Sequence, residues 1–126
     1  METTYCPCGS SISYTDCCGR YLEGVAFTPN AEALMRSRYV AYVLCKSSYL
    51  IQTTHPKKRY LHNQKDIEDW SLENKWLRLE IVEVSEKVVV FKAYFLDSTL
   101  QPQVHYERSR FEKIDGCWYY LDGEFL

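Results

Sequence analysis

The residues most able to do chemistry are four cysteines near the start of the chain. They are Cys6, Cys8, Cys17 and Cys18, spaced as C-x-C, eight residues, then C-C. Two close pairs joined by a short turn can present four thiolates to one ion, and Zn²⁺ prefers such tetrahedral sites. The proline inside the first pair and the glycine after it suit a tight metal-binding turn. The sequence therefore predicts one structural zinc ion held by these four residues.

Other interpretations of this segment remain open, namely a disulfide, a redox-active thiol pair, free thiols, or an iron–sulfur cluster. The first residues show neither the basic nor the apolar region of a secretory signal, which favours a cytoplasmic protein whose thiols stay reduced. The remaining cysteines, Cys45 and Cys117, stand alone and are expected to be buried thiols in the core.

Composition limits the class of protein. With 126 residues, 46% hydrophobic and 15% aromatic, the chain can build one domain with a core, which excludes collagen, coiled coil and disorder. The 15 basic residues are matched by 17 acidic ones, so nucleic-acid binding is not expected. The basic run 55–60 is expected to be a solvated loop, with a weak RNA or acidic-protein contact as the alternative. We expect no membrane association, and a monomer or weak dimer.

Hydrophobic spacing predicts that helices come first along the chain. Residues 19–30 are expected to be a linker, with Thr28 and Pro29 starting a helix over 31–45. A short helix is expected over 47–52, capped by Ser47 or Ser48, and another turn begins at Asn63 and runs through residue 70.

From residue 76 the hydrophobic period changes to two. Strands are expected over 76–82, 88–96, 104–114 and 117–121, and Asp115-Gly116 predicts a type I′ hairpin between the last two. Helices followed by a meander of strands predict an α+β fold, a curved antiparallel sheet wrapped on helices. The organisation we expect is a small zinc knuckle over 1–22 and a cone-like body over 23–126.

The body offers a few candidates for a pocket, chiefly His55, Glu107 and Arg38, with Tyr39 and Arg110 beside them. A histidine with a carboxylate can exchange protons near neutral pH. Alternatively, His55 caps a helix end, and the arginines pair with acids. Alternation along the third strand places Glu107 on one sheet face with residues 109 and 111. If that face is buried, the carboxylate needs Arg38 or a hydroxyl as its partner.

Two parts of the chain, the cysteine segment and the body, each resemble a known family. The run Cys6-Pro7-Cys8-Gly9-Ser10, followed by Asp16-Cys17-Cys18-Gly19, resembles the SEC-C zinc motif, although Ser11 and Ile12-Ser13 replace its usual glycine and lysine. Ala33-Leu34-Met35-Arg36-Ser37-Arg38-Tyr39, Glu107-Arg108-Ser109-Arg110-Phe111 and the segment from Asp115 to Gly123 resemble the YchJ-type bacterial proteins. The resemblance implies a nuclear-transport-factor-two-like body, in which a bent sheet wraps a long helix, with bound zinc. It implies no activity.

These observations favour a binding or adaptor protein for a protein partner or small ligand over an enzyme. The alternative is a small cytoplasmic enzyme whose site in the cone uses His55 or Glu107, and a third is a ribosome- or RNA-associated factor. The shape of the body separates the first two: an open polar cavity lined by Glu107 and Arg38 favours a ligand or enzyme site. A filled aromatic core favours an adaptor.

Overall fold

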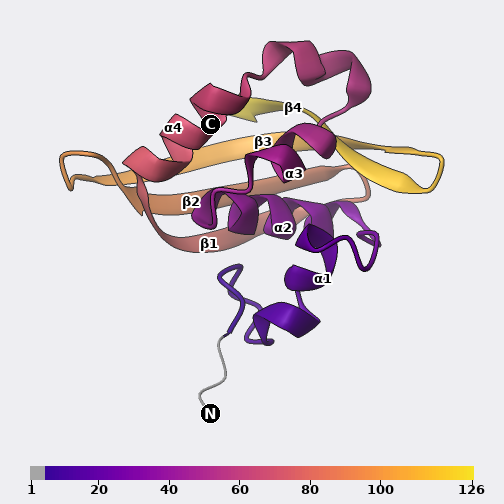
Figure 1. Cartoon of the computed structure of the whole chain (residues 1–126), viewed down its shortest axis with the longest axis horizontal. Helices are drawn as coiled ribbons and strands as arrows, with labels where there is room; N and C mark the ends of the chain where they lie inside the picture. Colours follow the sequence, from indigo (N-terminus) through magenta and orange to yellow (C-terminus); the bar gives the residue numbers. More distant parts are fainter. Residues whose placement is uncertain (1–4) are drawn as a thin grey trace.

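Helices precede strands along the chain, and the strands form one sheet behind the helices (Figure 1). The computed structural model describes residues 5–126, so the first four residues of the predicted knuckle lie outside it. The helical elements are η1 (Tyr14–Asp16), α1 (Gly19–Leu22), α2 (Ala31–Val43), α3 (Ser47–Gln52), η2 (Pro56–Leu61) and α4 (Gln64–Glu73), where η marks a 3₁₀ helix. The strands are β1 (Lys75–Val84), β2 (Val88–Leu96), β3 (Pro102–Ile114) and β4 (Cys117–Phe125).

The sheet is an antiparallel meander in the order β1-β2-β3-β4. Asp115 and Gly116 both have positive φ, 49° and 84°, as the predicted type I′ hairpin requires. Register shifts in β1 and between β3 and β4 add local twist, because a bulge bends the strand that carries it. The α+β class and its curved sheet are confirmed.

Burial alternates along β3 as the period-two pattern predicts. Glu107, Ser109 and Phe111 are buried, whereas Arg108 and Arg110 are exposed. The Glu107 side of the sheet is therefore the inner face, which α2 covers.

Two helix starts differ from the sequence prediction. Helix α2 is capped by Asn30, whose side chain accepts a hydrogen bond of 2.8 Å from the Ala33 amide, so Thr28 lies two residues outside the cap. A serine cap was also expected on α3, but Ser47 is already helical and its hydroxyl donates to Glu68 of α4 at 2.9 Å. The Ser47 hydroxyl, which the local sequence predicts to cap α3, instead joins α3 to α4.

The remaining helical elements show what local patterns can and cannot indicate. The Asn63 side chain caps α4 by accepting a hydrogen bond of 3.1 Å from the Asp66 amide, which confirms that prediction. Helix α1 occupies part of the expected linker, and η2, over 56–61, takes most of the run 55–60 that the sequence predicts to be a loop. Both are short, and no long apolar period marks them.

The N-terminal lobe, residues 5–22, packs on the body rather than standing apart. The side chains of Cys6, Cys8 and Cys18 belong to the same buried cluster as residues of α2 and the sheet. Arg36 of α2 donates a hydrogen bond of 2.9 Å to the carbonyl of Cys8. In Figure 1 the lobe lies below α2 and β1, and α1 links it to the body.

The two isolated cysteines are less buried than the sequence predicts. Cys45 and Cys117 are partly exposed rather than buried, because Cys45 follows the end of α2 with φ 56° and Cys117 follows the last hairpin.

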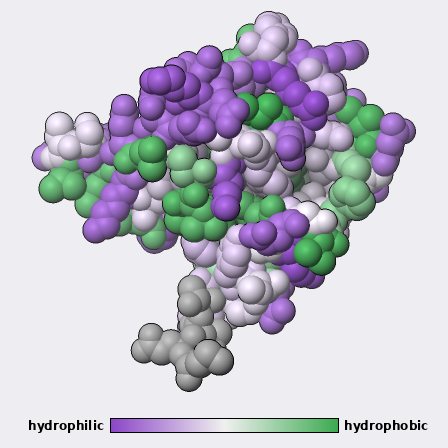
Figure 2. Space-filling view, viewed as in Figure 1, coloured by the Kyte–Doolittle hydropathy of each residue, from purple (hydrophilic) through white to green (hydrophobic). Residues whose placement is uncertain are grey.

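Figure 2 shows one face of the molecule, with hydrophilic residues over its upper part and hydrophobic residues gathered across its middle. Over residues 5–126, no helix is long and apolar enough to span a bilayer.

Candidate functional site

The four predicted ligands meet in the N-terminal lobe. Their sulfur atoms all lie within 4.8 Å of one another. The Sγ–Sγ distance is 3.7 Å from Cys8 to Cys17 and 4.0 Å from Cys17 to Cys18. A tetrahedral site with Zn–S bonds of about 2.3 Å needs sulfur atoms about 3.8 Å apart. The cluster can therefore hold a metal ion, and four thiolates complete its coordination.

The turn that brings the two pairs together is built from local contacts. Gly9 has φ 86°, a left-handed conformation that favours glycine. The Cys6 amide donates to the Ile12 carbonyl at 2.8 Å and closes the loop. The hydroxyl of Ser10 lies 3.1 Å from the sulfur of Cys17, where it can donate to a thiolate.

The electrostatics of the cluster favour a cation. Hydrogen bonding from Cys18 lowers the pKa of the Cys8 thiol to about 4. Burial raises the pKa of Cys6 to about 11, and hydrogen bonding with Cys8 together with burial raises the pKa of Cys18. One thiolate is thus stabilised by its neighbours, while a second would be repelled. A divalent ion removes that repulsion, so metal binding goes with loss of the thiol protons.

A second candidate site is a cavity of about 220 Å³ between α2 and the inner face of the sheet. We call it the cone cavity. It is lined by residues from α2, α4, the segment after η2 and all four strands. Those residues are Met35, Arg38, Tyr39, Tyr42, His62, Trp70, Trp76, Phe91, Ala93, His105, Glu107, Tyr120 and Phe125. Four of them lie on α2 at spacings of three and four residues, so a single helix face forms one wall.

Aromatic rings form much of the cavity wall. The indole of Trp76 lies 6.0 Å from that of Trp70 and 5.7 Å from the ring of Tyr42, measured between centroids. The ring of Phe125 meets the His105 imidazole edge to face at 5.1 Å. Such a wall suits a flat apolar group, because rings favour offset and edge contacts.

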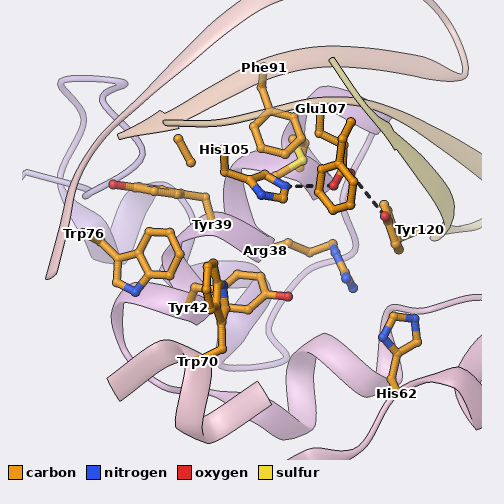
Figure 3. Close-up of a pocket in the computed structure, with 13 residues that line it drawn as sticks. Arg38, Tyr39, Tyr42, His62, Trp70, Trp76, Phe91, His105, Glu107 and Tyr120 are labelled. Carbon is orange, nitrogen blue, oxygen red and sulfur yellow. Dashed lines mark hydrogen bonds and ion pairs between the residues drawn. The ribbon is translucent and has the colours of Figure 1, made fainter. Parts of the chain in front are cut away.

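Glu107 carries the negative charge of the cavity. His105 Nε2 lies 2.8 Å from Glu107 Oε1, and the Tyr120 hydroxyl donates to Oε2 at 3.1 Å (Figure 3). The Ser109 hydroxyl also donates to Oε2. Burial alone would raise the pKa of Glu107, but the hydrogen bonds from His105, Ser109 and Tyr120 outweigh it and hold the pKa below its ordinary value. The carboxylate therefore stays ionised at neutral pH.

Arg38 carries the positive charge and is only 5% exposed. Its Nη1 donates to the Leu50 carbonyl at 2.8 Å and to the Thr53 hydroxyl at 2.7 Å. The guanidinium carbon lies 4.5 Å from the centre of the Tyr120 ring. Burial lowers the pKa of Arg38, but an arginine remains charged in proteins. Arg38 does not hydrogen-bond Glu107; of the two partners that the sequence suggested, the hydroxyl is the one found, in Ser109 and Tyr120, and His105 is added to it.

Three of the five predicted pocket residues line the cone cavity and two do not. Arg38, Glu107 and Tyr39 all line the cone cavity. His55 does not: its Nδ1 accepts from the Lys57 amide at 3.1 Å, and its Nε2 lies 3.1 Å from Glu112. It caps the start of η2, so it accepts from an amide rather than donating to carbonyls. Arg110 lies on the outer sheet face, paired with Asp122.

Sequence reasoning missed four polar residues of the cavity, namely His105, His62, Tyr42 and Tyr120. A signal for His105 existed, because the alternation that put Glu107 on the inner face also puts the residue two positions earlier there. Tyr42 follows Arg38 by four residues and so lies on the same face of α2. Nothing in the local sequence marks His62, which reaches the cavity from the segment between η2 and α4.

Gly123 leaves the space that the Glu107 carboxylate occupies. A methyl group there would overlap that carboxylate and approach the Tyr120 hydroxyl at 2.7 Å. We expect Gly123→Ala to displace the carboxylate and lower the free energy of unfolding by about 2 kcal/mol, as overpacking does. Urea denaturation measures this, with the exposed neighbour Glu124→Ala as the control. Equal stability of the two variants would contradict the close fit.

The fold agrees with that of similar proteins. Residues 30–123 match the family model described as YchJ, middle NTF2-like domain. The chain belongs to the YchJ-like family. It is 44% identical to a UPF0225 protein of Streptomyces coelicolor, covering 100% of this chain and 99% of that one. It is also 44% identical to a UPF0225 protein of Photorhabdus laumondii, covering 96% and 80%.

Two solved structures extend the likeness to the N-terminal lobe. A solution structure of a SEC-C motif protein from Rhodopseudomonas palustris matches with a TM-score of 0.90 and 40% identity, covering 96% of this chain and 98% of that one. A crystal structure of another such protein, from Psychrobacter arcticus, matches with a TM-score of 0.77 and 34% identity, covering 97% and 81%. The YchJ-like, NTF2-like and SEC-C resemblances read from the sequence are therefore confirmed.

Proposed function

We propose that this protein binds a small organic ligand in the cone cavity, while the N-terminal lobe is a structural zinc site. The observation that supports the proposal is the cone cavity, whose lining includes two charged side chains. Arg38 and Glu107 both reach it, and the rest of the wall is mostly aromatic. Ligand sites in proteins share this make-up: a concave, largely apolar surface with a few well-placed polar groups.

The shape of the body supports a ligand rather than only a docking surface for a protein. An adaptor needs no internal cavity, and a filled aromatic core would have served it. Here two charged side chains are buried at a cavity, where each would be costly without a partner. Glu107 has its hydrogen-bond partners within the fold, whereas the guanidinium of Arg38 is only partly hydrogen-bonded, so a ligand that binds Arg38 offsets the cost of burying it.

Zinc is the ion we propose for the cysteine cluster. Four thiolates match its preferred tetrahedral set, and three of the four residues are nearly fully buried. A closed set leaves no position for a reactive water, so the role is structural. Reduced thiols also suit the cytoplasm, where we place the protein.

The ligand proposal is tested by filling the cavity. Ala93 lies on its β2 wall and is 4% exposed. We expect Ala93→Leu to weaken binding of three probes, 2-naphthoate, 2-naphthamide and 2-naphthylmethylammonium, by about tenfold or more, since a side chain takes their space. Isothermal titration calorimetry measures the affinities, and Val104→Leu on the exposed outer face is the control. Failure of all three probes to bind the unchanged protein at millimolar concentration would sink the proposal, as would equal binding by Ala93→Leu.

A further inference from the structure

We propose that the ligand of the cone cavity carries a carboxylate, which binds the free edge of the Arg38 guanidinium. This inference rests on the proposed function and adds the chemical class of the ligand. It follows from counting the hydrogen-bond donors and acceptors that the cavity leaves unused.

The acceptors of the cavity are already occupied. Glu107 receives a hydrogen bond at Oε1 from His105 and two at Oε2, from Ser109 and Tyr120. These donors come from β3 and β4, so the fold supplies them without a ligand. A carboxylate satisfied in this way has little capacity left for an ammonium group of a ligand.

The donors of Arg38 are only partly used. Within residues 5–126, all hydrogen bonds of this side chain come from Nη1, to Leu50, Thr53 and, at 3.4 Å, Thr54. Among residues 5–126, Nε and Nη2 have no hydrogen-bond partner, and Arg38 lines the cone cavity. Together these two atoms form the edge of a guanidinium that binds both oxygens of a carboxylate. The cavity thus lacks an acceptor at its positive charge.

Other groups also leave the cavity with more unused hydrogen-bond donors than unused acceptors. The Tyr42 hydroxyl, which points toward Arg38 in Figure 3, has no hydrogen-bond partner within residues 5–126 and can donate as well. Stacking against Tyr120 and the bonds of Nη1 hold the guanidinium in one orientation, so little freedom is lost on binding. The aromatic wall around Trp70 and Trp76 would receive the apolar body of the ligand. An amphipathic monocarboxylate with a flat body fits these features.

The same aromatic wall could instead attract a cation, since rings bind ammonium groups over their faces. Three probes of matched shape separate the possibilities on the unchanged protein: 2-naphthoate, the neutral 2-naphthamide and 2-naphthylmethylammonium. We expect 2-naphthoate to bind at least about tenfold more tightly than 2-naphthamide by calorimetry, because charge-assisted hydrogen bonds are the stronger ones. Equal affinities, or tightest binding of the ammonium probe, would overturn the carboxylate assignment while leaving a ligand site in place. If none of the three binds, the proposed function fails with it.

A variant that keeps the positive charge at position 38 tests whether Arg38 causes the preference for 2-naphthoate. We expect Arg38→Lys to reduce the advantage of 2-naphthoate over 2-naphthamide to about threefold or less, because an ammonium cannot offer a bidentate edge. Arg108→Lys, on the exposed outer face of β3, should keep the full advantage. Arg38 also holds α3 through Leu50, so the amide spectrum of the variant by nuclear magnetic resonance checks its fold. A folded Arg38→Lys protein with an unchanged preference would contradict the assignment, and the wild-type comparison stands without the variant.

Discussion

Replacing Cys8 by serine is expected to abolish zinc binding and to lower the free energy of unfolding by about 4 kcal/mol, the contribution of a ligand present at a thousand times its dissociation constant. The physical reason is that a hydroxyl is a poor zinc ligand at neutral pH, and Cys8 is fully buried at the junction of lobe and body. Metal analysis of protein purified without added zinc should give about one ion per chain for the natural sequence. The variant should give close to none, and its melting temperature should fall by about 10 °C or more.

Cys45→Ser is the matched control for this prediction. Cys45 is a partly exposed thiol outside the cluster, so its replacement should leave both the metal content and the melting temperature nearly unchanged. A Cys8→Ser protein that keeps a full equivalent of zinc would contradict the four-ligand site. So would natural protein that contains no metal and has four free thiols in its N-terminal lobe.

Loss of the metal should also be felt beyond the lobe, because α2 joins the two sites. Arg36 holds the Cys8 carbonyl from one side of this helix, while Arg38 and Tyr42 face the cone cavity. Tyr39 lies between them: it belongs to the core shared with the cysteines and also lines the cavity. The cysteine cluster, which we propose binds zinc, is therefore placed to hold the helix that forms one wall of the cavity.

Glu107→Gln is expected to lower the free energy of unfolding by about 3 kcal/mol at neutral pH, because it removes a charged acceptor and leaves buried donors unpaired. The amide keeps the shape of the side chain, so the loss reports the charge and its hydrogen bonds with His105, Ser109 and Tyr120. Urea denaturation measures it. Glu83→Gln, an exposed glutamate on β1, should change stability little.

The Glu107 effect should also depend on pH. The folded pKa of Glu107 lies below its ordinary value of 4.5. The ionised group therefore stabilises the fold fully above that value, and the contribution is lost as the pH falls through the folded pKa. The stability difference between natural protein and Glu107→Gln should shrink between about pH 6 and about pH 3. A difference that stays constant over this range would show that the carboxylate gains nothing from its partners.

The features that the sequence could predict are those set by near neighbours. The cysteine spacing identifies the ligand set because two pairs and a short turn suffice to form it. Asp115-Gly116 predicts a type I′ turn since both positions tolerate positive φ, and both adopt it. The alternation in β3 predicts the inward face of Glu107 because side chains of a strand point to alternate sides.

The cavity depends on contacts between distant parts of the chain, and here sequence reasoning was incomplete. His55 precedes a proline in a basic run, and nothing local shows that its ring nitrogens go to Lys57 and Glu112. His105 has the same side chain, yet the sheet places it beside Glu107 and the helices leave an opening in front of it. The alternation of β3 indicates only that His105 faces inward; that a cavity lies in front of it, and that His62 reaches the same cavity, is decided by tertiary packing.

A crystal structure of the protein saturated with 2-naphthoate tests the central claim most directly. Our account predicts electron density for the probe inside the cone cavity, with its carboxylate within hydrogen-bond distance of Nε and Nη2 of Arg38. Its rings should lie against the indoles of Trp70 and Trp76. Density for the probe only on the outer surface, with the cavity free of it at saturating concentration, would contradict the account.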